Sequence, residues 1–182
     1  MGMVAPTYHT ADMVRAFPSD GNRYEVVHGE LLVTPSPRPL HQVVLQRLQL
    51  ALGTYLEREP VGQLLTSPAD ISWGPDILVQ PDLFVVDLAE ARTLDWGRMR
   101  TLRLAVEILS PSSARADRFT KRRLYQEQGV PAYWVVDADA EVIEVWTPGV
   151  AFPAAERETV RWQPAGARAA FGLALATLFR PV

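Results

Sequence analysis

Apolar residues recur along this chain with two different spacings, and each spacing predicts a different kind of element. From residue 40 to residue 59 they return every three or four positions, as at Val44, Leu48 and Leu52, which is typical of a helix with one buried face. Elsewhere they form short runs bounded by Gly, Pro, Asp or Ser, which is typical of strands. The near-continuous run from Leu83 to Val86 predicts a strand covered on both faces, as in a mixed sheet flanked by helices.

The same pattern predicts the order of the elements. Helices are expected at residues 11–17, 40–59 and 114–128, and strands at residues 24–27, 30–34, 63–71, 77–86, 102–109, 132–136, 141–146 and 158–162, with a weaker apolar segment at 171–179. His28 and Gly29 are expected to turn the first two strands into a hairpin. Residues 88–99 are expected to form a loop. We interpret the chain as one α/β domain, with an N-terminal extension at residues 1–39, a core at about 40–147 and C-terminal strands at 148–182.

The composition is that of a domain with a sizeable core. The chain has 182 residues, of which 48% are hydrophobic and 21% charged. No apolar run reaches the roughly 18 residues that a membrane-spanning helix needs, and the first residues lack the basic and apolar regions of a signal peptide. We therefore expect no membrane segment and a cytoplasmic location. The absence of cysteine excludes disulfides and thiolate zinc sites, so any metal ion must be held largely by oxygen atoms.

Positive charge is concentrated in one segment. The net charge of −3 by itself argues against a nucleic-acid partner. Residues 92–123, however, contain nine basic residues and three acids, a local charge of +6 that leaves −9 for the rest of the chain. This segment could bind backbone phosphates, with Arg115, Arg118 and Arg122 as candidates, or its arginines could be solvated surface residues.

Two acids lie where the pattern predicts buried strands. Asp82 stands at the head of one strand and shares a face with Phe84, while Glu107 lies inside another and shares a face with Ala105. Buried carboxylates are normally paired, neutralised or bound to a cation, because burying an unpaired charge is costly. If the two strands are neighbours, both acids can converge on one Mg²⁺, which takes oxygen ligands and keeps several waters.

Lys121 is the only lysine in a chain that has 17 arginines. Since arginine supplies the positive charge almost everywhere else, this lysine can have a specific role: a compact ammonium can sit beside a water molecule, which a guanidinium cannot imitate. Asp117, Lys121 and Tyr125 are spaced by four residues and therefore share one face of the predicted helix. The alternative is a surface ion pair next to a packed tyrosine.

Six stretches together resemble the PD-(D/E)XK nuclease superfamily, and within it the Uma-type family of bacterial restriction endonucleases. They are YEVVHGELLVTPSP, the helix that begins at His41, VQPDLFVV, VEILSPSS, DRFTKRRLY and GVPAYWVVD, in this order. The resemblance implies a restriction-endonuclease-like α/β fold, with Asp82 in the PD element and Glu107 as the acid of (D/E)XK. The lysine expected two residues after this acid is replaced by Leu109. In the Uma-type branch its role falls to the next helix, a position that Lys121 fits.

The resemblance gives a meaning to further residues. Superfamily nucleases often bring an extra acid from an early element toward the metal, and Glu30 could supply it or could be an ordinary exposed strand glutamate. His41 could bind phosphate or orient water, since imidazole changes charge near neutral pH, or the backbone at the helix start could satisfy it without any function. Asp117 and Tyr125 would lie behind the metal ligands or face the substrate.

These observations lead to the hypothesis of a DNA endonuclease that depends on Mg²⁺ or Mn²⁺. Asp82 and Glu107 would hold the metal ion, and Lys121 would stabilise the phosphate or position the attacking water. The resemblance and the apolar final strands also suggest a homodimer. Two alternatives stay open: a catalytically inactive module that keeps the nuclease fold to bind nucleic acid or a protein partner, and a different metal-dependent hydrolase on the same scaffold.

Overall fold

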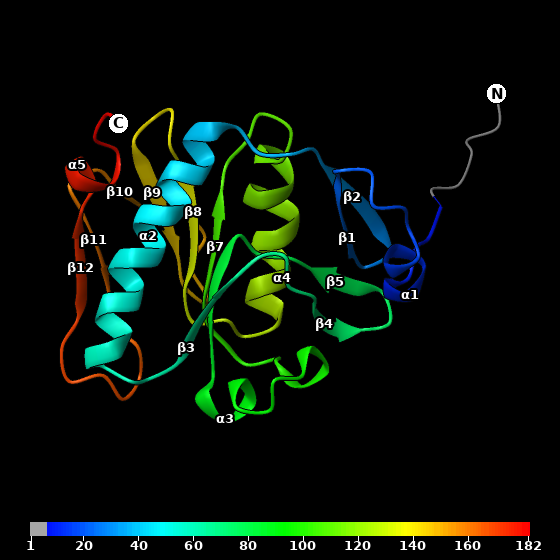
Figure 1. Cartoon of the computed structure of the whole chain (residues 1–182), viewed down its shortest axis with the longest axis horizontal. Coiled ribbons are helices and arrows are strands. Elements are labelled where there is room, and N and C mark those ends of the chain that lie inside the picture. Colours follow the sequence, from blue (N-terminus) through cyan, green and yellow to red (C-terminus); the bar gives the residue numbers. More distant parts are fainter. Residues whose placement is uncertain (1–6) are drawn as a thin grey trace.

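The computed structural model describes residues 7–182, which form two main β-sheets, a third sheet of two strands and the helices around them (Figure 1). The largest sheet consists, in spatial order, of β10 (Ala154–Glu156), β9 (Val142–Trp146), β8 (Tyr133–Asp137), β7 (Leu102–Ile108), β6 (Leu83–Val86) and β3 (Gln63–Thr66). Strands β7 and β8 are parallel, and the other neighbours in this sheet are antiparallel. The parallel pair requires a crossover connection, which the helical segment after β7 provides.

A second sheet lies at the opposite end of the molecule from the C-terminal strands (Figure 1). It consists of β2 (Glu30–Thr34), β1 (Arg23–Val27), β5 (Ile77–Val79) and β4 (Ile71–Gly74), in this order. The hairpin of β1 and β2 turns at His28 and Gly29, which both have positive φ angles, as expected for a two-residue hairpin turn. The third sheet pairs β11 (Thr159–Trp162) with β12 (Phe171–Ala174).

Helices cover both faces of the six-stranded sheet. On one face α2 (Pro39–Arg58) packs Val44 and Leu48 in the same core cluster as Leu83 and Val85 of β6. On the other face α4 (Arg122–Glu127) places Leu124 and Tyr125 in a core cluster with Phe84 and Val86. Alternate residues of β6 therefore point to different helices, which confirms the strand buried on both faces.

The shorter helices complete the structure. They are α1 (Ala11–Arg15), α3 (Leu88–Ala91), the 3-10 turn η1 (Trp96–Arg98), the π-helical segment η2 (Ala116–Lys121) and α5 (Leu175–Leu178). Within residues 7–182 no helix is long and apolar enough to cross a membrane.

Two predicted strands are each divided in the structure. The strand predicted at 63–71 forms β3 and reaches only the first residue of β4, and the strand predicted at 77–86 forms β5 and β6; in each case the two parts lie in different sheets. Pro68 and Pro81 stand in the gaps, and because proline cannot donate to a ladder, it marks the place where the chain leaves one sheet for the other. The prediction of continuous strands was wrong at these positions.

Other differences are smaller. The predicted helix at 114–128 is present, but η2 forms its middle with π-helical geometry. The predicted loop at 88–99 contains α3 and η1, and the apolar segment at 171–179 divides into β12 and α5. Strand β10 had no counterpart in the predicted pattern because its sequence, AAE, carries no strand signal.

Glu90, in α3, holds this helix against Arg100 and Thr101, the two residues that precede β7. Its carboxylate accepts hydrogen bonds from the backbone N–H groups of Arg100 and Thr101, both at 2.8 Å, and from the Thr101 hydroxyl at 2.7 Å. Burial alone would raise the pKa of Glu90, but these bonds outweigh it and lower the pKa.

We expect Glu90→Ala to lower the free energy of unfolding by about 2 kcal/mol, because it leaves two backbone donors without their charged acceptor. Urea denaturation followed by circular dichroism measures this change. Glu57→Ala, at an exposed position of α2, is the control and should change stability by less than about 0.5 kcal/mol. Equal stability of the two variants would contradict the anchoring role of Glu90.

Candidate active site

The pairing of β6 with β7 brings the two predicted acids to one place. Leu83 pairs with Val106, so Asp82, one residue before Leu83, and Glu107, one residue after Val106, stand across from each other where the ladder ends. The backbone N–H of Ile108 donates to Asp82 Oδ2 at 2.8 Å, which fixes the aspartate against β7. Asp82 is 4% exposed and Glu107 0% exposed. The two strands are neighbours, which is the condition under which both acids could converge on one metal ion.

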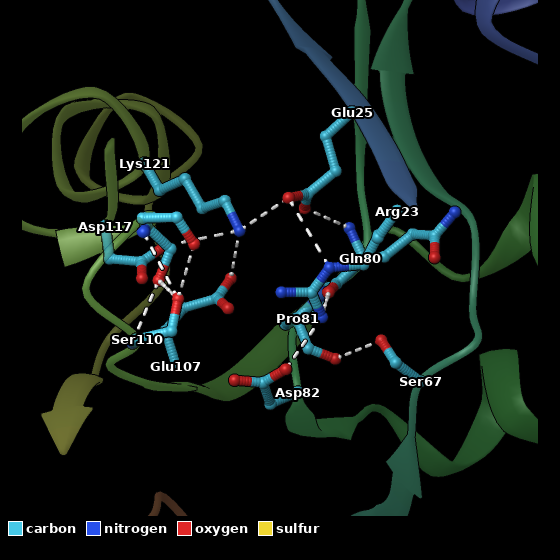
Figure 2. A network of polar contacts seen from close by, with 12 residues as sticks. Arg23, Glu25, Ser67, Gln80, Pro81, Asp82, Glu107, Ser110, Asp117 and Lys121 are labelled. Carbon is cyan, nitrogen blue, oxygen red and sulfur yellow. Dashed lines mark hydrogen bonds and ion pairs between the residues drawn. The ribbon is translucent and has the colours of Figure 1, made fainter. Parts of the chain in front are cut away.

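Lys121 reaches Glu107 from η2. Its Nζ lies 3.0 Å from Glu107 Oε1, 2.8 Å from Glu25 Oε2 and 3.3 Å from Asp117 Oδ1. Figure 2 shows its ammonium pointing toward Glu25 and Glu107. The lysine is thus completely buried among three carboxylates, although Leu109 occupies the position two residues after Glu107.

The predicted helix face is also present. The hydroxyl of Tyr125, one helical turn after Lys121, donates to Glu107 Oε1 at 3.1 Å. Asp117, four residues before Lys121, forms the ion pair described above. All three residues therefore point toward β7, and the interpretation as a surface ion pair is wrong because each is 1% exposed or less.

Asp82 has two further partners besides Ile108. Arg23, the first residue of β1, donates from one terminal nitrogen to Asp82 Oδ1 at 2.7 Å, and His41 Nε2 lies 3.0 Å from Asp82 Oδ2. Because an ionised carboxylate only accepts hydrogen bonds, His41 donates from Nε2. Burial alone would raise the pKa of Asp82, but His41, Arg23 and the N–H of Ile108 outweigh it and hold the pKa below its usual value.

The buried carboxylates outnumber their cations. Glu25, Asp82, Glu107 and Asp117 are all buried. Burial raises the pKa of Glu107 well above its ordinary value; the charge of Lys121 opposes this shift and the neighbouring acids add to it. Burial alone would lower the pKa of Lys121, but the surrounding carboxylates raise it, so its ammonium stays charged. Lys121 and Arg23 together cannot balance these four carboxylates, so without a further cation a proton is favoured on Glu107.

A pocket of about 600 Å³ opens from solvent onto this cluster. The residues that line it include Arg23, His41 and Asp82, as well as Ile108 and Ser110, which come shortly after Glu107. A ligand can therefore reach Asp82 through the pocket, while Lys121 lies deeper in the protein.

The early acid of the cluster is Glu25 and not Glu30. Glu30 is exposed on β2 and lines a separate surface pocket with Phe119 and Arg123. Glu25 is fully buried on β1, where its Oε1 accepts the backbone N–H of Gln80 at 2.7 Å. Glu25 is followed by two valines in its strand, and an acid beside apolar strand residues is the signal that identified Glu107, so sequence reasoning could have found Glu25.

The three arginines proposed for phosphate binding lie in different surroundings. Arg118 forms ion pairs with Asp137 at 3.0 Å and with Glu144 at 2.8 Å. The guanidinium of Arg122 stacks 4.6 Å from the ring centre of Trp146. Arg115 is exposed. Two of the three are thus engaged within the protein, and Arg115 is the one whose charge faces solvent.

Comparison with known families gives this geometry a context. A profile of the Uma2 family, described as "Putative restriction endonuclease", matches residues 11–176. The chain belongs to the Uma2 family. Its structure is similar to the crystal structure of a "putative nuclease belonging to DUF820" from Anabaena variabilis, with a TM-score of 0.77 and 18% sequence identity over 94% of this chain and 97% of that chain. At this identity the likeness shows the fold, which is restriction-endonuclease-like. A search of curated proteins found no match.

The raised pKa of Glu107 in this Uma2 protein makes the stability of the fold depend on pH. Because the pKa of Glu107 is raised in the folded state, its protonated form contributes stability that is present below the ordinary pKa of 4.5 and is lost as pH rises through the folded-state pKa. Glu107→Gln removes this titration. We therefore expect the free energy of unfolding of Glu107→Gln, relative to the wild type, to increase as pH rises above 4.5.

Urea denaturation between about pH 5 and pH 8, with a chelator present to exclude divalent metal, measures the difference. Glu57→Gln, at the exposed α2 position, serves as control and should keep a constant difference from the wild type. A constant difference for Glu107→Gln as well would mean that Glu107 titrates alike in the folded and unfolded chains.

Proposed function

We propose that this protein is a Mg²⁺- or Mn²⁺-dependent endonuclease that hydrolyses phosphodiester bonds of DNA. The observation that carries the proposal is the meeting of Asp82 and Glu107 across β6 and β7, with the Lys121 ammonium 3.0 Å from Glu107. Two carboxylates and a buried ammonium beside an open pocket are the groups that metal-assisted phosphodiester hydrolysis requires. Membership of a family described as "Putative restriction endonuclease" supports the same reaction.

The residues present fit a divalent cation. Glu107 Oε2 is buried and has no hydrogen-bond partner among residues 7–182, so one carboxylate oxygen is free to bind a metal ion. Among residues 7–182, two permanent cations, Arg23 and Lys121, pair with the four buried acids, and a divalent ion would balance the remaining charge. In the described part of the chain no three acidic or histidine side chains form a ready-made cage. Water and substrate oxygens would therefore complete the shell, as Mg²⁺ prefers.

The protein's own residues would divide the work around this ion. Asp82 and Glu107 would hold it, and the bound ion would polarise a phosphoryl oxygen and lower the pKa of a coordinated water. Lys121 stays protonated, so it would stabilise negative charge on the phosphate instead of accepting a proton. Glu25 and Asp117 position its ammonium from two other sides, and His41 orients Asp82.

One observation favours a catalytically inactive module instead. Both oxygens of Asp82 already accept hydrogen bonds, Oδ1 from Arg23 and Oδ2 from His41 and Ile108. A protein that kept this arrangement would already have the charge of Asp82 balanced by Arg23, which weakens metal binding through Asp82. The experiment below separates the two functions.

We expect cleavage of supercoiled plasmid or single-stranded circular DNA in Mg²⁺ or Mn²⁺, and none when the metal is chelated. Asp82→Asn, Glu107→Gln and Lys121→Met should each reduce the rate at least about 100-fold, because each removes a charge that acts on the transition state. Gel electrophoresis of timed samples measures the rate. Asp12→Asn is the matched control. Asp12 is an exposed acid of α1, and among residues 7–182 its one ion pair is with Arg15.

Equal cleavage by the wild type and by the Asp82→Asn/Glu107→Gln double variant would reject the proposed site. DNA binding that needs no metal, without cleavage under any metal condition, would support the inactive module.

A further inference from the structure

Arg23 is the other cation of the cluster, and it differs from Lys121 in its surroundings. It enters from β1, and its guanidinium lies between Glu25 and Asp82 (Figure 2). One terminal nitrogen donates to Asp82 Oδ1 at 2.7 Å and to the carbonyl of Gln80 at 3.1 Å. Its Nε lies 3.8 Å from Glu25 Oε2. The side chain is 20% exposed and lines the 600 Å³ pocket, whereas Lys121 is 1% exposed.

The contact with Asp82 Oδ1 has a direct consequence for metal binding. Asp82 Oδ2 is occupied by His41 and by the N–H of Ile108, so Oδ1 is the oxygen that a metal ion would use. A guanidinium carries only donors and stays charged at every physiological pH. Oδ1 has a second lone pair, but a guanidinium and a divalent cation at the same oxygen repel each other, so Arg23 and the metal compete electrostatically for Asp82.

The pocket provides space for the guanidinium of Arg23 when it leaves Asp82. The pocket lies beside its guanidinium, and its Nε has no hydrogen-bond partner among residues 7–182. A substrate phosphate that enters the pocket toward Asp82 would meet this planar group, whose paired N–H donors match phosphate oxygens. Lys121 cannot move in the same way, because its side chain is buried and its ammonium is held by three carboxylates.

We propose that Arg23 is an exchangeable counter-ion of Asp82: a divalent metal displaces its guanidinium from Asp82 Oδ1, and the freed guanidinium then binds and positions the substrate phosphate. This inference rests on the proposed function. It assigns Arg23 two successive partners, the carboxylate in the metal-free protein and the phosphate in the substrate complex. Arg23 is a substrate-positioning residue in this scheme, and Lys121 remains fixed throughout.

The two roles predict opposite effects of one substitution. Arg23→Gln removes the competing charge, so we expect it to bind Mn²⁺ about tenfold more tightly than the wild type in isothermal titration calorimetry. The same variant should raise the KM for DNA about tenfold or more, since it loses the phosphate contact. If Arg23 were merely structural, its substitution would weaken the binding of Mn²⁺ as well as that of DNA. Arg38→Gln, which removes an exposed arginine paired with Asp139 at 2.6 Å, is the matched control and should change neither value.

Arg23→Lys gives a second test that keeps the charge. We expect Mn²⁺ affinity within about threefold of the wild type, because an ammonium still competes for Asp82, but a raised KM, because a point charge lacks the paired donors. This variant decides the question if Arg23→Gln does not fold. A KM for Arg23→Lys equal to that of the wild type would overturn the phosphate-binding role.

The failure of this inference can be told from the failure of the proposed function. If the wild type binds Mn²⁺ through Asp82 and Glu107, and Arg23→Gln binds it no more tightly, Arg23 is not a competing counter-ion and only the present inference is overturned. If Mn²⁺ binds to neither protein, both the inference and the proposed metal site are overturned. Binding to Arg23→Gln but not to the wild type would support the displacement of Arg23 as the step that limits metal entry.

Discussion

The burial of Lys121 among Glu25, Glu107 and Asp117 is the interaction on which the rest of this structure depends. An unpaired charge in a protein interior is strongly unfavourable, and removing one partner of a buried pair leaves the others uncompensated. The three acids come from β1, β7 and η2, so one ammonium links the four-stranded sheet, the six-stranded sheet and the crossover segment. The proposed active site is therefore also the place where the main parts of the fold meet.

The topology explains how Lys121 reaches Glu107 from 14 residues further along the chain. Strands β7 and β8 are parallel neighbours, so the connection between them must return across the sheet. It does so as η2 and α4, which pack on the sheet face that carries Phe84 and Ala105. Glu107 points to this same face, and the lysine on the returning helix lies over it. The crossover segment thus supplies, as Lys121, the cation that Leu109, two residues after Glu107, cannot provide.

The sequence predicted what depends on local patterns. The periodicity of α2, the alternation in β6 and the helical spacing of Asp117, Lys121 and Tyr125 all follow from side chains close together in the chain. The assignment of β3 and β4 to different sheets did not, because sheet membership depends on long-range pairing that a proline only hints at. Glu30 was proposed as the early acid from the family resemblance, although Glu25, followed by two valines in its strand, carried the same signal of burial as Glu107.

Anomalous X-ray diffraction from crystals soaked in Mn²⁺ tests the central claim most directly, because it locates the metal without relying on activity. The account predicts one Mn²⁺ bound by both Asp82 and Glu107 at roughly 2.0 to 2.2 Å, with Lys121 unmoved and the guanidinium of Arg23 turned from Asp82 into the pocket. Crystals that bind Mn²⁺ elsewhere, while Arg23 still contacts Asp82 Oδ1, would contradict it.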